Sequence, residues 1–329
     1  MSNQAAFLTA TQSPFEIRPV PIPTPKPNEI VIKTAASFGP AVFPFLQLPT
    51  IIGEDLAGTI TPVGSLVANF KPGDHVAALS LAAFQRHVAV PSHLAIPIPS
   101  SLPFEQAAVL PLRLSVAAQA LFSKSYLALR LPISGGNTEQ NNGSILIWGG
   151  STSVGSNAIQ LAKAAGYEVI TTASPRNFEY VKSLGATGVF DYNSPTIKEE
   201  LLAAFQGKKV VGAIANRAPT PEGHKVIVDT CAAVVKGIQG ANRFLACTMV
   251  LREDAPEGVE AKFVQTFIEP GSEELAGEIY GGYVAKALAS GEFVATPKAA
   301  VEGKGLEGIQ GAIEVVAKGV SAVKVVVTI

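Results

Sequence analysis

The chain has little cysteine, and this excludes several classes of protein. Of its 329 residues only two are cysteines, Cys231 and Cys247. Two cysteines cannot build a disulfide framework or a four-cysteine zinc lobe. We expect both to be small, buried core residues in a protein of the reducing cytoplasm.

The chain also lacks an excess of charge and any long apolar run. Its formal net charge at pH 7 is −1 and it has no basic block, so nucleic acid and anionic membranes are poor candidate partners. Although 47% of the residues are hydrophobic, no stretch of about 18 is uninterrupted, and we expect no transmembrane helix. The start, Met1–Phe7, has neither the basic nor the apolar part of a signal peptide. We therefore expect a cytoplasmic location.

The first part of the chain, to about residue 120, lacks long helical periods and carries many prolines and short β-rich runs. Ile30–Lys33 and His87–Val90 are such runs, and Lys71–Asp74 contains the Pro-Gly-Asp signal of a tight turn between strands. This pattern predicts a small β-barrel-like domain that begins the chain and extends over residues 1–122.

From about residue 144 the pattern changes to strands that alternate with helices. Such alternation indicates an α/β protein with a parallel, doubly wound sheet, the Rossmann arrangement, and we place this second domain at residues 123–292. The expected strands are 145–148, 168–172, 189–190, 210–214 and 244–247, and the expected helices are 154–166, 176–184, 196–206, one ending near 237, and 273–289.

The end of the chain returns to a β pattern. We expect Val323–Ile329 to form a strand that pairs back with the first domain. That domain is then discontinuous and consists of residues 1–122 and 293–329. Residues 134–143 are rich in glycine, asparagine and serine and predict an exposed loop.

The most informative stretch begins with an apolar run at Ile145. The run enters the turn Gly150-Ser151-Thr152-Ser153-Val154-Gly155, and a helical pattern follows. The turn matches the fingerprint G-x-G-x-x-G, with Thr152 in place of the middle glycine. Unpaired N–H groups and the positive end of the helix dipole attract an anion at such a place. We therefore predict that residues 150–154 bind the pyrophosphate of a dinucleotide; the alternative is a turn without a ligand.

The end of the second strand indicates which dinucleotide binds. A site for NAD has Asp or Glu there, about 20 residues after the loop, to accept a hydrogen bond from the ribose. Residues 171–177 contain no carboxylate, but Ser174 and Asn177 offer donors and Arg176 offers a positive charge. These groups suit the 2′-phosphate of NADPH, and the hydroxyl of Tyr192 after the third strand suits it too. For Arg176 the alternative is an ordinary surface charge.

With these motifs the chain resembles the zinc-free branch of the medium-chain dehydrogenase/reductases, which includes quinone oxidoreductases and enoyl reductases. It is most similar to the fungal subgroup of trans-acting polyketide enoyl reductases. The resemblance implies a chaperonin-10-like (GroES-like) catalytic domain, interrupted in sequence by the Rossmann domain, with the active site in the cleft between them. The matching segments are Pro49–Gly58, Phe70–Val76, Trp148–Gly155, Ser174–Phe178, Val189–Tyr192, Gly303–Gln310 and Gly319–Val326.

The resemblance also implies which chemistry is missing. Zinc-containing members carry Gly-His-Glu where this chain has Gly53-Glu54-Asp55, and no upstream cysteine is present to join it. These residues cannot form a tetrahedral site of nitrogen and sulfur ligands, so we expect no metal and no metal-assisted alcohol oxidation. Glu54 and Asp55 either meet a hard cation or form a turn with one capped carboxylate.

The segment that corresponds to the substrate-binding part of such enzymes departs from the family pattern. Residues 37–48 are shorter than the corresponding segment of such enzymes and contain no Asp, Trp, Lys or Tyr. The usual proton donor is therefore absent or displaced, and no catalytic residue is assigned. Phe38, Phe43 and Phe45 either line an apolar pocket or pack in the core.

Four further residues are candidates for the cofactor site. The resemblance implies that Ser115 lies near the nicotinamide and that Lys324, in a terminal Ser-x-x-Lys run, serves the cofactor. Asn216 and Arg217 follow the fourth strand, where this fold makes nicotinamide contacts. The alternatives are a capping serine, a surface strand lysine and a loop charge.

We expect hydride transfer from NADPH to the activated C=C bond of an enone or enoyl thioester, or to a quinone. The substrate is then a small and mainly apolar molecule, and the resemblance allows a homodimer. One alternative is an NADPH-binding sensor or accumulated protein with little turnover, which the shortened segment 37–48 favours. Alcohol dehydrogenation is the other alternative, and the missing zinc ligands argue against it.

Overall fold

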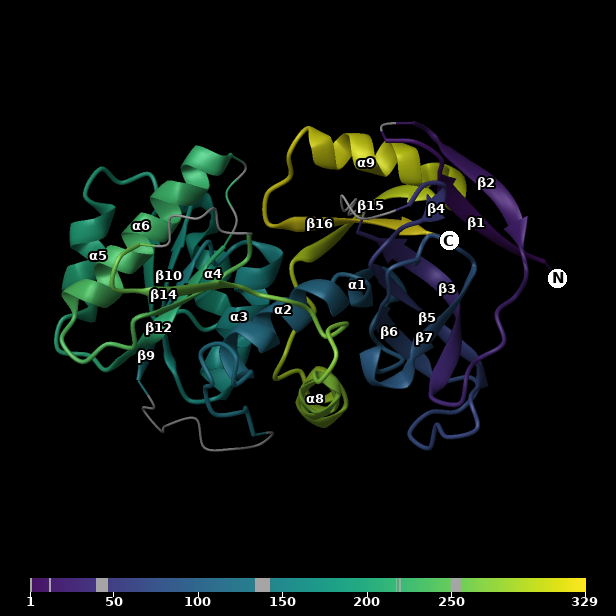
Figure 1. The fold of residues 1–329 in the computed structure, drawn as a ribbon, viewed down its shortest axis with the longest axis horizontal. Coiled ribbons are helices and arrows are strands. Elements are labelled where there is room, and N and C mark those ends of the chain that lie inside the picture. Colours follow the sequence, from purple (N-terminus) through teal and green to yellow (C-terminus); the bar gives the residue numbers. More distant parts are fainter. Residues whose placement is uncertain are drawn as a thin grey trace. The chain divides into compact units, whose positions relative to one another are not determined.

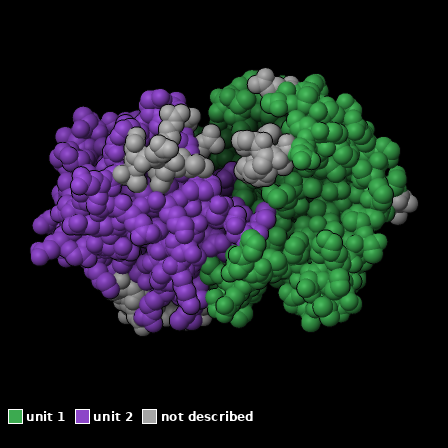
Figure 2. Space-filling model, viewed as in Figure 1, with its two compact units in different colours: residues 1–112, 270–329 green, residues 113–269 purple. Residues whose placement is uncertain are grey.

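The computed structural model divides the chain into two compact units (Figures 1 and 2). Unit 1 consists of residues 1–112 and 270–329, and unit 2 of residues 113–269. The structure describes residues 2–11, 13–39, 47–133, 143–216, 218, 220–249 and 256–329. The expected loop at 134–143 lies, apart from its last residue, outside this described part.

Unit 2 is built on a six-stranded sheet in which every neighbouring pair of strands is parallel. The strand order is β11-β10-β9-β12-β13-β14, which is the Rossmann order with its reversal between β9 and β12. This confirms the predicted doubly wound sheet. The strands are β9 (Ser144–Trp148), β10 (Glu168–Ala173), β11 (Gly188–Asp191), β12 (Val210–Ala215), β13 (Phe244–Cys247) and β14 (Glu260–Phe263).

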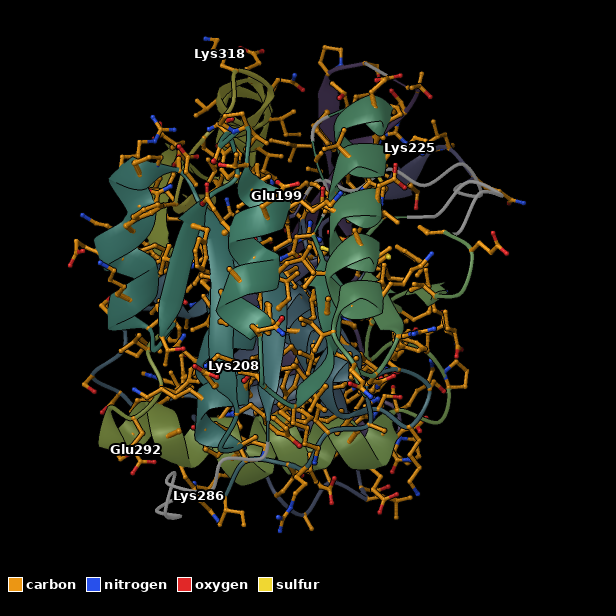
Figure 3. The ribbon with its side chains drawn as sticks, turned by 90° about the vertical axis from the view of Figure 1, so that its left-hand side faces the viewer. Glu199, Lys208, Lys225, Lys286, Glu292 and Lys318 are labelled. Carbon is orange, nitrogen blue, oxygen red and sulfur yellow. The ribbon has the colours of Figure 1, made fainter. Side chains whose placement is uncertain are left out.

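The helices of unit 2 bury their apolar faces against this sheet. Figure 3 shows α5 and α6, marked by Glu199 and Lys225, side by side in front of the strands. Cys231 and Cys247 are fully buried in the core of unit 2, which confirms that both are buried core residues. The helices are α3 (Ser153–Ala164), η2 (Pro175–Asn177), α4 (Phe178–Ser183), α5 (Ile197–Phe205) and α6 (Pro221–Gly237).

Unit 1 contains two sheets. The larger has the order β15-β16-β3-β5-β6-β8, with β7 paired to β3, and the smaller has the order β2-β1-β4. The C-terminal strand β16 pairs with both β3 and β15, so the chain end returns to the first domain as expected. The strands are β1 (Asn3–Leu8), β2 (Phe15–Val20), β3 (Glu29–Phe38), β4 (Thr50–Ile51), β5 (Asp55–Val63), β6 (His75–Leu79), β7 (His87–Pro91), β8 (Ala95–Pro97), β15 (Lys298–Lys304) and β16 (Val323–Thr328).

The structure contains helices that the sequence pattern does not indicate. The first 120 residues show no long helical period in the sequence, yet α2 (Pro111–Phe122) begins there. Every residue of α2 except Arg113 is buried, so the helix has no polar face and its sequence shows no helical period. The remaining helical elements are η1 (Ser92–Leu94), α1 (Phe104–Ala107), α7 (Glu273–Ala276), the π-helical η3 (Gly277–Val284), α8 (Ala285–Ser290), η4 (Leu306–Gly308) and α9 (Ile309–Ala317).

The boundaries of the compact units differ from those drawn from the sequence. The first division falls within α2, after Leu112, and the second falls before α7. The predicted helix at 273–289 is present as α7, η3 and α8, and these elements belong to unit 1. Whether the chain folds as domains 1–122 with 293–329 and 123–292 stays a prediction. Within the described ranges, no helix is both long enough and apolar enough to cross a membrane.

Candidate functional site

The loop after β9 is tied to the neighbouring strand β10. The N–H of Gly149 donates to Thr172 Oγ1 at 3.0 Å, and the N–H of Gly150 donates to the carbonyl oxygen of Thr172 at 2.8 Å. A Cβ atom on Gly150 would lie 2.4 Å from Thr171 Oγ1, which is closer than a side chain tolerates. Only glycine therefore lets the loop pass this close to β10. The sequence did not mark Thr172 as part of the site.

The side chain of Thr152 caps helix α3. Its Oγ1 accepts from the N–H of Gly155 at 3.0 Å and donates to the carbonyl oxygen of Gly149 at 2.8 Å. A Cβ atom on Gly155 would lie 2.3 Å from that same carbonyl oxygen, so the last glycine of the fingerprint is required. Since α3 begins at Ser153, the N–H groups of Ser153 and Val154 have no acceptor inside the helix. They are available to an anion at the positive end of the helix dipole.

One amide connects the loop to the turn after β10. Asn177 Nδ2 donates to Ser151 Oγ at 3.3 Å and to Ser174 Oγ at 3.1 Å. Each serine oxygen therefore accepts a hydrogen bond, and its own hydroxyl hydrogen is directed to another acceptor. Both hydroxyls thus suit an anionic ligand.

The other two residues predicted to contact the 2′-phosphate, Arg176 and Tyr192, have exposed side chains. Arg176 follows Ser174 in η2 and its side chain is exposed. Tyr192 follows β11 and is 43% exposed. Their predicted contacts with a 2′-phosphate stay predictions.

Asn216 stands directly after β12, on the other side of the sheet's reversal point. Its side chain is 3% exposed, and its Nδ2 donates to the carbonyl oxygen of Trp148 at 2.7 Å. Within the described residues Asn216 Oδ1 has no hydrogen-bond partner. Leaving a buried acceptor unpaired costs about 1–3 kcal/mol, so Asn216 Oδ1 is suited to accept a hydrogen bond from a ligand. Arg217, beside it, lies outside the described residues.

These features fit a dinucleotide. Gly150 and Gly155 have no room for a Cβ atom. The first N–H groups of α3 have no acceptor within the helix, and the buried Asn216 Oδ1 after β12 is an unpaired acceptor within the described residues. In a sheet of this order, ligands bind beyond the carboxyl ends of the strands at the reversal point, which is where β9 and β12 end.

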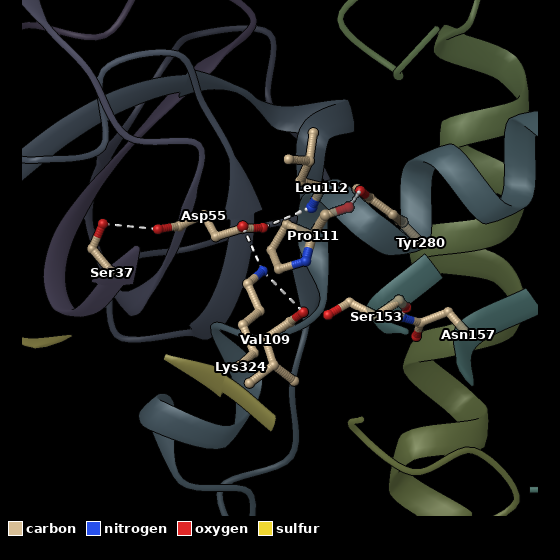
Figure 4. Close-up of polar contacts among 9 residues, drawn as sticks. All are labelled: Ser37, Asp55, Val109, Pro111, Leu112, Ser153, Asn157, Tyr280 and Lys324. Atoms are coloured by element: carbon tan, nitrogen blue, oxygen red, sulfur yellow. Dashed lines mark hydrogen bonds and ion pairs between the residues drawn. The ribbon is translucent and has the colours of Figure 1, made fainter. Parts of the chain in front are cut away.

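A separate polar cluster lies in unit 1 around Asp55 (Figure 4). Lys324 Nζ donates to Asp55 Oδ2 at 2.5 Å and to the carbonyl oxygen of Val109 at 3.1 Å. Asp55 Oδ1 accepts from the N–H of Leu112 at 2.7 Å, and Ser37 Oγ donates to the carbonyl oxygen of Asp55 at 2.8 Å. The side chains of Asp55 and Lys324 are only 1% and 10% exposed. The sequence did not foresee this cluster.

The cluster bears on the question of a metal. Across the described ranges, no group of three or more His, Cys, Asp or Glu side chains could hold a metal ion. Of the two carboxylates that the sequence left open, Asp55 already binds an ammonium and a backbone N–H. Glu54 is 5% exposed; its N–H donates to the carbonyl oxygen of Phe38, and its carbonyl oxygen accepts from the N–H of Ser80.

The remaining predicted residues are placed as follows. Ser115 lies on α2 and is fully buried. Phe38 is 3% exposed and packs in the core of unit 1 with Phe84, at a ring-centroid distance of 6.3 Å. Phe43 and Phe45 lie outside the described residues, and so does most of the shortened segment.

Comparison with known proteins agrees with this geometry. A family model described as the alcohol dehydrogenase GroES-like domain matches residues 27–100, and one described as zinc-binding dehydrogenase matches residues 153–235. The dehydrogenase azaJ of Aspergillus niger is 40% identical over 348 residues, which cover 100% of this chain and 99% of azaJ.

Enoyl reductases are among the similar proteins. The trans-enoyl reductase himH of Aspergillus japonicus is 37% identical over 348 residues, covering 99% of this chain and 97% of himH. The crystal structure of the CurK enoyl reductase matches with a TM-score of 0.75 at 19% identity, covering 100% of this chain and 99% of that one, and it shares the fold. The chain therefore belongs to the medium-chain dehydrogenase/reductase family, whose members bind nicotinamide cofactors, and it is an oxidoreductase that acts on small molecules.

Proposed function

We propose that the protein is an NADPH-dependent reductase that needs no metal and reduces an activated C=C bond or a quinone. One observation carries the cofactor part of the proposal. At the end of β10, Asn177 orients the hydroxyls of Ser151 and Ser174, and residues 171–177 contain no carboxylate. A 2′-phosphate gains charge-assisted hydrogen bonds from such donors, whereas a carboxylate there would repel it.

Different residues of the proposed set would bind different parts of the cofactor. The N–H groups of Ser153 and Val154 would take the pyrophosphate, and Gly150 would let it approach the backbone. Asn216 Oδ1 would accept from the nicotinamide half. When bound, NADPH supplies the hydride, while the chain supplies orientation and exclusion of water. The full proposed set is Ser115, Gly150, Ser151, Thr152, Ser153, Val154, Ser174, Arg176, Asn177, Tyr192, Asn216 and Lys324.

The substrate class rests on the relatives. himH is named a trans-enoyl reductase, and this chain matches it over nearly its whole length. We extend that activity to this chain as reduction of an apolar enone or enoyl thioester, with a quinone as the other acceptor. Asp55 is one of the two carboxylates that the sequence left open as cation ligands, and the ammonium of Lys324 already balances its charge. This ion pair favours chemistry without a metal.

A second candidate function is NADPH binding with little turnover. The observation in its favour is that residues 37–48 contain no Asp, Trp, Lys or Tyr to supply the proton that must follow the hydride. In a reductase, water or a ribose hydroxyl would have to supply that proton instead.

One assay separates the two functions. NADPH absorbance is followed with a panel of enals, enones, enoyl thioesters and ortho- and para-quinones, with and without a chelator. We expect turnover with at least one acceptor and no effect of the chelator. Tight NADPH binding without turnover across the panel would establish the second function, and turnover that the chelator abolishes would establish a metal mechanism.

A pair of variants ties the result to the site. Replacing both Ser151 and Ser174 by Ala should weaken NADPH binding, because two oriented donors are lost. Ser183→Ala is the matched control, since Ser183 is exposed on α4 and its hydroxyl donates to the carbonyl oxygen of Tyr180 in the same helix.

A further inference from the structure

We propose that Thr172 is a positioning residue, whose hydroxyl holds the loop after β9 in the shape in which the start of α3 can bind a pyrophosphate. The inference rests on the proposed function, because a pyrophosphate reaches the loop only if a dinucleotide binds. It goes beyond that function, since Thr172 is fully buried and acts through the loop rather than by touching the cofactor.

Gly149 is the point at which Thr172 holds the loop. Gly149 has the left-handed backbone conformation, with φ +75°, which glycine adopts without a steric cost. Its N–H donates to Thr172 Oγ1 at 3.0 Å. Its carbonyl oxygen accepts from the N–H of Thr152 at 3.1 Å and from Thr152 Oγ1 at 2.8 Å. Because glycine has many accessible conformations, these bonds on both sides of it select one of them.

Thr152 carries this placement to helix α3. The same Oγ1 that donates to Gly149 accepts from the N–H of Gly155 at 3.0 Å, in the first turn of the helix. Hydrogen bonds therefore connect Thr172 through Gly149 and Thr152 to the start of α3. All of these residues belong to unit 2.

The start of α3 is open to a ligand. Thr152 is exposed, and Ser151 and Ser153 on either side of it are half-buried. The N–H groups of Ser153 and Val154 have no acceptor within the helix. A shift of Thr152 therefore moves groups that a pyrophosphate would contact, whereas the buried Thr172 stays out of its reach.

Removing the hydroxyl of Thr172 would deprive the half-buried N–H of Gly149 of its acceptor. An unpaired donor of this kind is costly, so the loop would turn Gly149 toward water and lose the shape that Thr152 transmits. The turn after β10 has its own connection to the loop, from Asn177 Nδ2 to Ser151 Oγ at 3.3 Å, which does not involve the side chain of Thr172. The pyrophosphate and the 2′-phosphate should therefore respond differently to a change at Thr172.

The test compares two fragments of the cofactor. Adenosine 5′-diphosphate carries the pyrophosphate assigned to the loop, whereas adenosine 2′-monophosphate carries only the phosphate assigned to the turn after β10. In Thr172→Val, which keeps the branched shape, we expect the affinities for NADPH and adenosine 5′-diphosphate to fall by about tenfold in calorimetric titrations. The affinity for adenosine 2′-monophosphate should change by less than about twofold, and Thr172→Ser, which keeps the hydroxyl, should retain all three affinities to the same precision.

Further variants keep the comparison decisive. Thr230→Val is the matched control, because it removes a threonine hydroxyl that donates to the carbonyl oxygen of Val226 within α6, and it should change none of the affinities. In a Thr152→Ala background, Thr172→Val should lose most of its effect on NADPH, because residues that act through one another are not additive. Should Thr172→Val fail to fold, Thr172→Ala is compared with Thr172→Ser, since these two variants differ only in the hydroxyl.

Three results would overturn the inference. Equal weakening of both fragments would show a merely structural role, and native affinities in Thr172→Val would show that the hydroxyl does not matter for binding. Additive effects of Thr172→Val and Thr152→Ala would show that Thr172 does not act through Thr152. If the native protein binds neither NADPH nor adenosine 5′-diphosphate, the proposed function fails and the inference fails with it. If it prefers NADH, only the cofactor preference fails, and adenosine 5′-diphosphate still tests Thr172.

Discussion

At the scale of single residues, Thr152 shows how a departure from a fingerprint is accommodated. The middle position of G-x-G-x-x-G is glycine when the backbone must approach the pyrophosphate closely. In this chain the backbone at Thr152 is extended, with φ −72° and ψ 162°, so no glycine is needed for the conformation. The threonine hydroxyl instead caps α3 through Gly155. The loop keeps its shape by a side-chain bond that a glycine could not make.

Ser174 is the residue at which cofactor preference can be reversed. We predict that Ser174→Asp lowers the affinity for NADPH by at least about tenfold relative to NADH, since a carboxylate beside Asn177 repels a 2′-phosphate but accepts from a ribose hydroxyl. The ratio of the two dissociation constants, measured by titration of both cofactors, checks this. Ser183→Asp, an exposed change on α4, controls for added charge alone. Preferential binding of NADH by the unchanged protein would refute the interpretation of residues 171–177.

At the scale of elements, the amino ends of β9 and β10 are joined by a part-exposed polar cluster. Lys208 Nζ lies 2.7 and 2.9 Å from the two carboxylate oxygens of Glu168, and Ser144 Oγ donates to one of them. Burial alone would raise the pKa of Glu168, but the hydrogen bonds from Lys208 and Ser144 and the charge of Lys208 outweigh it and hold the pKa below its ordinary value. The cluster therefore stabilises unit 2 when Glu168 is ionised.

A pH-dependent stability difference follows from that lowered pKa. The stabilisation is complete above the ordinary value of 4.5 and is lost as the pH falls through the folded-state value, because the unfolded chain then binds the proton more readily. We predict that Lys208→Met lowers the free energy of unfolding at pH 7 by about 0.5–1 kcal/mol, as expected for a part-exposed pair. Urea unfolding at a series of pH values should show this gap narrowing below pH 4.5.

The control for this prediction is Lys198→Met, which removes an exposed lysine from the first turn of α5. It should leave the unfolding free energy nearly unchanged at every pH. A gap for Lys208→Met that persists undiminished in acid would mean that packing of the lysine stem, and not the charge on Glu168, supplies the stabilisation.

How far the sequence predicts an element depends on whether its pattern is local. β9, the fingerprint and α3 were predictable because an apolar run, glycine positions and a helical period all lie within about twenty residues. The helix α2 was not, since its nearly complete burial removes the polar face that reveals a period. β14 was missed because its four residues, Glu260–Phe263, alternate exposed with half-buried side chains and include two charges.

For the site, too, the parts that depend on a local pattern were predictable and the parts that depend on distant contacts were not. The loop and the turn after β10 lie within one βαβ unit, so their roles follow from spacing. The pair of Asp55 and Lys324 joins positions 269 residues apart, and no local pattern can indicate that they meet. The same holds for Tyr280 and Pro111, which are 169 residues apart. Such contacts depend on the tertiary fold, which a reading of local patterns does not supply.

At the scale of the whole molecule, both thiols belong to one unit. Cys231 and Cys247 lie in the core of unit 2, and the chain has no other cysteine. Burial raises the pKa of the Cys231 thiol, with a contribution from Cys247, and burial raises the pKa of Cys247 to about 12. Since only the thiolate reacts, neither side chain should be modified while unit 2 stays folded. Thiol labelling therefore reports the opening of unit 2 without interference from unit 1.

We predict that NADPH slows this labelling. A ligand that binds only the folded unit stabilises it by RT ln(1 + [L]/Kd), so at a concentration 100 times the Kd the open fraction falls about a hundredfold. When closing is faster than labelling, the rate of reaction with an aromatic disulfide reagent falls by the same factor. In the variant with Ala at both Ser151 and Ser174, the same NADPH concentration should protect less. Native thiols that react as fast as free cysteine would contradict the buried placement, and a rate unaffected by saturating NADPH would show that the dinucleotide does not hold unit 2 closed.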